Sequence, residues 1–201
     1  MHSLIIQSRF LGGCMISLCI GFCAVGCRAG TGVIEQLDES TGLTILSESR
    51  PLVFARAETR YSISGRDYIY LGPVETNRQG TRAYFLWVGM ATTLDRGYLA
   101  PPAEVPDTLY IETQDEIFDF KLHPWSTQSP GLSDEPLYQT AVAVQMELAA
   151  RATLNQLVVL TAEPATSIRI TDSVGITRRY ERWEPEQDWS EFLERARATV
   201  D

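Results

Sequence analysis

From about residue 33 onward, short apolar runs alternate with polar residues at a period of two, and Gly, Pro, Asn and Asp separate one run from the next. This pattern is typical of antiparallel strands that bury one face. It therefore constrains the chain to a mainly β fold. The first half of the pattern predicts strands over residues 42–46, 51–56, 68–75, 82–93, 108–113 and 117–122.

Turn sequences indicate which of these strands pair. Residues 77–80 read Asn-Arg-Gln-Gly, and the glycine can adopt the positive φ that a tight turn requires. We therefore expect 68–75 and 82–93 to form a hairpin. The same reasoning predicts two further hairpins, which join 108–113 to 117–122 across 114–116 and 167–171 to 176–183 across 172–175.

The segment 137–160 is ambiguous, because its apolar residues fit both a helix and an alternating strand. We interpret it as a strand up to Val144, a short helix from Met146 to about Thr153, and a buried strand over 156–160.

The chain closes with a predicted amphipathic helix. Asp188 is placed to cap it, with Glu191 three residues on. An apolar stripe follows at spacings of three and four and must bury against a sheet. The expected fold class is α+β: an antiparallel sheet or sandwich of about eight or nine strands, with a short helix and the C-terminal helix packed on it. The stripe consists of Trp189, Phe192, Leu193, Ala196 and Val200.

The cysteines are confined to the N-terminal segment, at positions 14, 19, 23 and 27. The rest of the chain therefore has neither a disulfide framework nor a cysteine zinc site. Residues 10–26 carry no charge and follow Arg9, which is the form of a secretory signal. They end in Ala24-Val25-Gly26-Cys27, which resembles the bacterial lipobox, where small or aliphatic residues precede an acylated cysteine. The alternative is an uncleaved membrane anchor, which needs about 20 apolar residues.

The lipobox resemblance implies a lipoprotein precursor. Residues 1–26 would be the signal peptide, Cys27 the site that takes up diacylglycerol with acyl chains such as palmitate, 27–33 a tether, and 34–201 a single globular domain. Arg28 stands where many lipoproteins retained at the inner membrane have Asp. The resemblance therefore implies an outer-membrane protein that faces the periplasm.

No motif for catalysis, cofactor or metal binding stands out. His123 shares one strand face with Asp115, Asp119 and Lys121, yet four residues of strand separate Asp119 from His123 by roughly 13 Å, too far to share one ion. There is no Gly-x-Ser-x-Gly elbow and no phosphate-binding glycine loop. The acidic residues at 184, 186, 188 and 191 could suggest a pair of catalytic carboxylates. A surface loop that contains Pro185, followed by the cap of the C-terminal helix, explains them better. A net charge of -9 argues against nucleic-acid binding.

One aromatic set offers two interpretations. Tyr68 and Tyr70 share a face of one predicted strand, Phe85 and Trp87 share a face of its neighbour, and Tyr84 lies opposite. Such pairs ordinarily stabilise a sheet, but an uncovered face would form a binding surface. For function we expect a non-enzymatic envelope lipoprotein that contacts another envelope protein. The alternatives are a binder of a small apolar or lipid ligand between sheet and helix, which would need an internal cavity, and an enzyme whose polar cleft the linear sequence hides.

Overall fold

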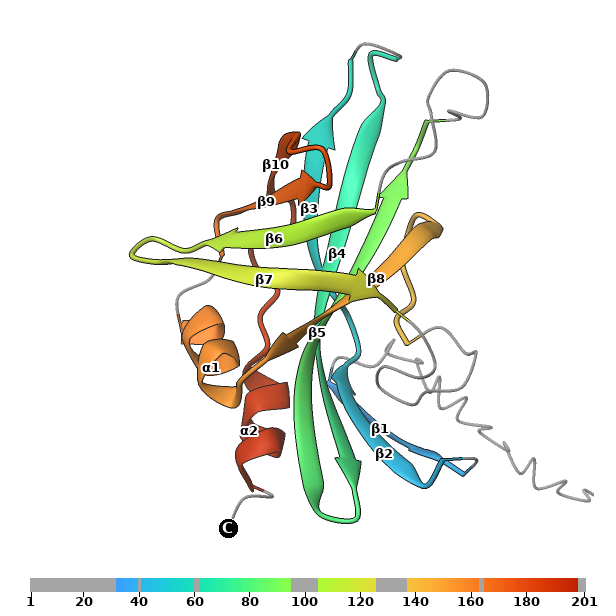
Figure 1. Cartoon of the computed structure of the whole chain (residues 1–201), viewed down its shortest axis with the longest axis vertical. Coiled ribbons are helices and arrows are strands. Elements are labelled where there is room, and N and C mark those ends of the chain that lie inside the picture. Colours follow the sequence, from blue (N-terminus) through green and yellow to red (C-terminus); the bar gives the residue numbers. More distant parts are fainter. Residues whose placement is uncertain are drawn as a thin grey trace, which may run out of the picture.

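The computed structural model describes residues 32–39, 41–59, 62–94, 105–125, 137–162 and 165–198. Within them, ten antiparallel strands form one sheet, accompanied by two short helices (Figure 1). The elements are β1 (Val33–Asp38), β2 (Leu43–Glu48), β3 (Leu52–Ala57), β4 (Arg66–Arg78), β5 (Thr81–Thr92), β6 (Pro106–Glu112), β7 (Ile117–Pro124), β8 (Val144–Ala152), α1 (Leu154–Ala162), β9 (Ser167–Asp172), β10 (Thr177–Arg182) and α2 (Ser190–Ala198).

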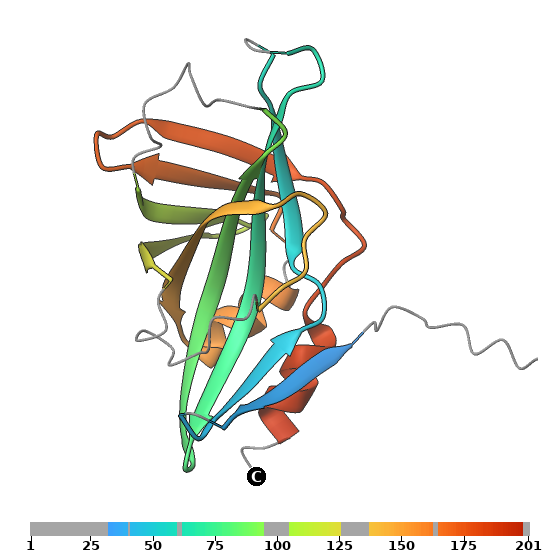
Figure 2. The same cartoon turned by 90° about the vertical axis from the view of Figure 1, so that its right-hand side faces the viewer.

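Eight of the strands close into a barrel in the order β4-β3-β10-β9-β6-β7-β8-β5, because β5 pairs back to β4. The expectation of a mainly antiparallel fold with a C-terminal helix is confirmed, but the sheet closes on itself and does not form a two-layer sandwich. The long strand β4 explains the shape: its first half pairs with β3, its second half pairs with β2, and its other edge pairs with β5 along its whole length. The β1–β2 hairpin is thereby added beside the barrel (Figure 2).

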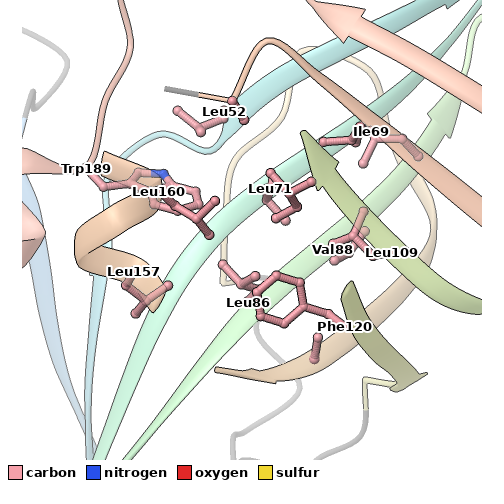
Figure 3. Close-up of a cluster of buried hydrophobic side chains, with 14 of the residues drawn as sticks. Leu52, Ile69, Leu71, Leu86, Val88, Leu109, Phe120, Leu157, Leu160 and Trp189 are labelled. Carbon is pink, nitrogen blue, oxygen red and sulfur yellow. The ribbon is translucent and has the colours of Figure 1, made fainter. Parts of the chain in front are cut away.

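Apolar side chains fill the barrel interior. Leu71, Leu86 and Leu109 are completely buried. Leu157 and Leu160 of α1 reach the same cluster, as does Trp189, which immediately precedes α2 (Figure 3). The helices thus cover one end of the barrel. At the end of β3 and β4 away from the helices, the interior becomes charged: Arg56 donates to Glu58 and Asp67, both at 2.9 Å.

The structure confirms all three predicted hairpins. In the β4–β5 turn, Gln79 and Gly80 have φ of 51° and 89°, and the Gly80 amide donates to Asn77 Oδ1 at 2.9 Å. The β6–β7 and β9–β10 hairpins form across the predicted turns. Local turn chemistry therefore decided these pairings.

The interpretation of 137–160 was wrong: residues 137–143 form no strand, and beyond them helix and strand are interchanged. Residues predicted as a helix form β8, which pairs with β5 and β7 and completes the barrel. Residues predicted as a buried strand belong to α1. A capping box starts this helix: Thr153 Oγ1 accepts from the Gln156 amide at 3.2 Å, and Gln156 Oε1 accepts from the Thr153 amide at 2.8 Å. The Thr-x-x-Gln sequence at 153–156 is a local signal for the start of a helix, but the hydrophobic period of the segment favoured a strand there.

No helix in the parts of the chain that the structure describes is long and apolar enough to cross a membrane.

Candidate functional site

The aromatic set belongs mainly to the protein core. Tyr70, Phe85 and Trp87 are buried in a second apolar cluster on the outside of β4 and β5, whereas Tyr84 packs with the barrel interior, as expected. Tyr138 covers this cluster, with its ring centroid 4.9 Å from that of Trp87 and its hydroxyl donating to the Pro73 carbonyl at 2.7 Å.

Two glycines make room for this aromatic packing. A Cβ at Gly72 would lie 2.3 Å from the ring of Tyr138, and one at Gly89 would lie 2.5 Å from the ring of Trp87. Both glycines stand within strands because no side chain fits under the rings. Among the described residues, Tyr138 thus covers the cluster over Trp87, so this part of the aromatic set is core, whereas Tyr68 is only partly buried against it.

The His123 face is a solvated strand face. Asp119, Lys121 and His123 are exposed and alternate with the buried Phe120 and Leu122, so they point away from the barrel. Lys121 Nζ forms an ion pair at 2.8 Å with Oδ2 of Asp107, which lies on the neighbouring strand β6. Among the described residues, no group of three or more His, Cys, Asp or Glu is arranged to hold a metal ion.

A groove of about 710 Å³ lies at the N-terminal end of α2, between the start of β1, the end of β2 and the loop that follows β10. One arginine, Arg50, lines it together with several carboxylates and the half-exposed indole of Trp183. The carboxylates belong to Glu48, Glu184, Glu186, Asp188 and Glu191.

Arg182 holds the loop that forms one wall of this groove. Its Nε donates to the Glu184 carbonyl at 3.0 Å, and its Nη2 donates to the Gln187 carbonyl. The guanidinium also lies 5.3 Å from the ring centroid of Phe54. Burial is the largest influence on Arg182 and lowers its pKa below the ordinary value. One half-buried cation therefore ties the loop backbone to the barrel wall.

Glu48 joins the groove to α2. Its Oε1 accepts from the Phe192 amide at 2.9 Å, so a strand residue 144 positions away satisfies an amide in the first turn of the helix. Asp188 acts locally, as its Oδ1 accepts from the Ser190 amide at 3.0 Å and from the Ser190 hydroxyl. The predicted cap at Asp188 is thus present, and Glu48 adds a second cap from outside the helix.

The pKa values of the two capping carboxylates, Glu48 and Asp188, are shifted in opposite directions. Burial raises the pKa of Glu48, an effect that the Phe192 amide opposes and that the charges of Glu191 and Asp188 reinforce. The hydrogen bonds from Ser190 lower the pKa of Asp188. Ionised Glu48 is therefore destabilised by burial and by the neighbouring negative charges. A cation bound in the groove would offset that destabilisation.

Because its pKa is raised in the folded state, Glu48 makes folding less favourable as the pH rises through that pKa, and has no such effect below the unfolded value near 4.5. We expect Glu48→Gln, which keeps an acceptor for the Phe192 amide, to unfold at higher urea concentration than wild type at pH 8 and at nearly the same concentration at pH 3.5. Urea titrations at both pH values check this. Asp119→Asn, on the exposed β7 face, is the matched control; equal shifts in both variants would contradict the assignment.

The sequence placed the acidic residues 184–191 in a loop and helix cap, and the structure shows that four of them line one groove with Glu48. Four acidic residues within eight positions were the sequence signal for an acidic surface. Sequence spacing alone could not show that Glu48 and Trp183 lie in the same groove. Cys27, the predicted lipid attachment site, lies outside the described residues.

Comparison with protein-family models, with curated proteins and with solved structures found no match to this chain. The functional argument therefore depends on the groove itself. Its surface is open and acidic, which suits a positively charged group of a second molecule. The half-exposed indole of Trp183 adds apolar area at its wall, although Arg66 of the same chain already lies 4.6 Å from the centroid of that ring.

Proposed function

We propose that this chain is a non-enzymatic envelope lipoprotein, anchored by lipid on Cys27 at the periplasmic face of the outer membrane, that acts by binding another envelope protein. The observation that carries the proposal is the acidic groove beside Gly32. Gly32 follows Cys27 by five residues, which span at most about 18 Å when fully extended. A lipid on Cys27 would therefore keep the groove close to the membrane surface, where an envelope partner can reach it.

The core favours contact through the surface over storage of an apolar ligand. Leu86, Leu109 and Phe120 meet side chains from both helices inside the barrel, where an internal ligand would have to lie (Figure 3). By contrast, the groove is open and has a half-exposed tryptophan at its wall. Tryptophan is among the residues that contribute most to binding energy at protein interfaces.

The anchor is tested by expressing the wild type and Cys27→Ser in a Gram-negative host. We expect the wild type in the outer-membrane fraction, with an intact mass that lacks residues 1–26 and includes the lipid. Cys27→Ser should lose both the lipid mass and the membrane association, because the thiol is the atom that lipid is attached to. An intact N-terminus in both proteins would overturn the lipoprotein assignment.

The contact is tested in the same cells by placing a photocrosslinking phenylalanine analogue at position 183, in the groove wall, or at position 119, on the exposed β7 face. We expect one defined envelope protein to be crosslinked from position 183 and not from 119. Equal crosslinking from both positions, or none from 183, would argue against the groove as the contact surface.

A further inference from the structure

Strand β1 has an edge that no strand pairs with in the part of the chain that the structure describes. It stands at the end of the sheet order and pairs with β2 alone (Figure 2). An unpaired edge presents a row of backbone N–H and C=O groups that can take up a strand from another molecule.

The hydrogen-bond register shows which amides of β1 face this edge. Gly32 lies opposite Ser49, and the Gly32 carbonyl accepts from the Ser49 amide at 2.8 Å. Antiparallel pairs alternate between bonded and non-bonded positions, so the even-numbered residues of β1 bond to β2. The backbone groups of Val33, Glu35 and Leu37 therefore point outward. Leu37 is also 64% exposed, so a substitution there disturbs little packing.

The surroundings of this edge determine the chemistry of its partner. A second groove of about 670 Å³ lies between β1 and α2 and is lined by Glu35, Glu191, Glu194 and Arg195, among others. Arg195 Nη2 bonds to Glu35 Oε2 at 3.0 Å. Glu191 lines both grooves, so one acidic surface continues from Trp183 along the edge of β1.

We propose that the partner adds an extended segment to the free edge of β1, with Lys or Arg at alternate positions facing α2 and apolar residues between them. This rests on the proposed function and specifies its partner. Side chains of an added strand alternate between the two faces of the sheet. Those on the α2 side meet Glu191 and Glu194, whereas those on the other side lie next to Ile34 and Gln36. The six residues of β1 offer about 20 Å of edge.

A second copy of this chain is a poorer occupant of the same edge. Its β1 would bring Glu35 toward the α2 side, where Glu191 and Glu194 already stand. Like charges at such short distance oppose pairing. The acidic surface therefore selects a basic strand from a different protein.

The test uses the full chain in detergent micelles and a fluorescein-labelled peptide, acetyl-(Lys-Val)₄-amide, followed by fluorescence anisotropy. We expect saturable binding that weakens with salt, and at least tenfold weaker binding of the matched (Glu-Val)₄ peptide. Hydrogen exchange should slow at the amides of 33, 35 and 37. Binding with no protection there, or equal binding of the two peptides, would overturn the proposal.

Leu37→Pro removes one outward amide and leaves the β1–β2 bonds in place, because proline is tolerated at edges whose N–H faces solvent. We expect it to weaken binding about tenfold, whereas Leu37→Thr should bind within twofold of wild type. A (Lys-Val)₄ peptide N-methylated on alternate residues should also bind weakly, and it tests the same bonds without any change to the protein. Wild-type affinity of Leu37→Pro and of the methylated peptide would overturn the proposal.

Two further outcomes separate the alternatives. Light scattering that shows a dimer of the wild type but a monomer of Leu37→Pro would assign the edge to a second copy and overturn the basic-strand proposal. Peptide binding requires no lipid, so the two tests are independent. If the peptide fails to bind but Cys27→Ser no longer associates with the membrane, this inference is overturned and the lipid anchor is retained.

Discussion

Trp189→Ala is expected to lower the free energy of unfolding by about 3–5 kcal/mol, the range typical of a buried Trp or Phe that is truncated to Ala. Trp189 is 1% exposed, and its ring enters the barrel beside Leu160 at the helix-covered end (Figure 3). The substitution removes the ring and leaves a cavity between α2 and the sheet. Because α2 also carries Phe192 into the same cluster, the helix would lose much of its attachment to the barrel.

Urea denaturation followed by circular dichroism measures this loss. Trp183→Ala is the matched control, because that indole is 47% exposed and packs against Tyr68 and Arg66 at the surface, outside the barrel core. We expect the control to lose no more than about 1 kcal/mol, as most surface substitutions do. Equal losses in both variants would contradict the assignment of Trp189 to the core.

Arg56→Met is expected to lower the free energy of unfolding by a comparable amount, about 3–5 kcal/mol, because it removes the guanidinium from two buried carboxylates. Glu58 and Asp67 are 3% and 6% exposed, and each accepts from Arg56 Nη2 at 2.9 Å. Methionine preserves much of the side-chain volume, so lost charge compensation is the main change. The loss should be largest at neutral pH, where both carboxylates would be ionised in the unfolded chain.

Thermal and urea unfolding of two further variants tests the cause. Arg179→Met removes a cation that is exposed at the surface, where ion pairs with Glu112 and Glu181 are screened, so we expect a loss of at most about 1 kcal/mol. Adding Glu58→Gln and Asp67→Asn to Arg56→Met should restore most of the stability. If the triple variant is no more stable than Arg56→Met, the loss comes from packing and not from charge.

The elements that could be predicted are those whose decisive contacts are local. The β4–β5 hairpin needs only Gly80 in a left-handed conformation, and the apolar stripe of α2 needs only spacings of three and four. Strand β1 was not predicted, since an edge strand with exposed residues at four of six positions shows no alternation. The interchange of β8 and α1 has a different reason, because β8 becomes a strand through its pairing with β5 and β7.

The sequence by itself determined the antiparallel β character, the three hairpins and the closing helix, because turn residues and hydrophobic period act over a few positions. The lipid anchor at Cys27 also comes from the sequence alone and stays a prediction. Only the tertiary structure decided that the sheet closes, that Tyr138 covers Trp87, and that Glu48 caps α2 beside the acidic loop. These contacts join residues far apart along the chain, and each forms only when the packing of the whole barrel compensates the entropy of closing such long loops.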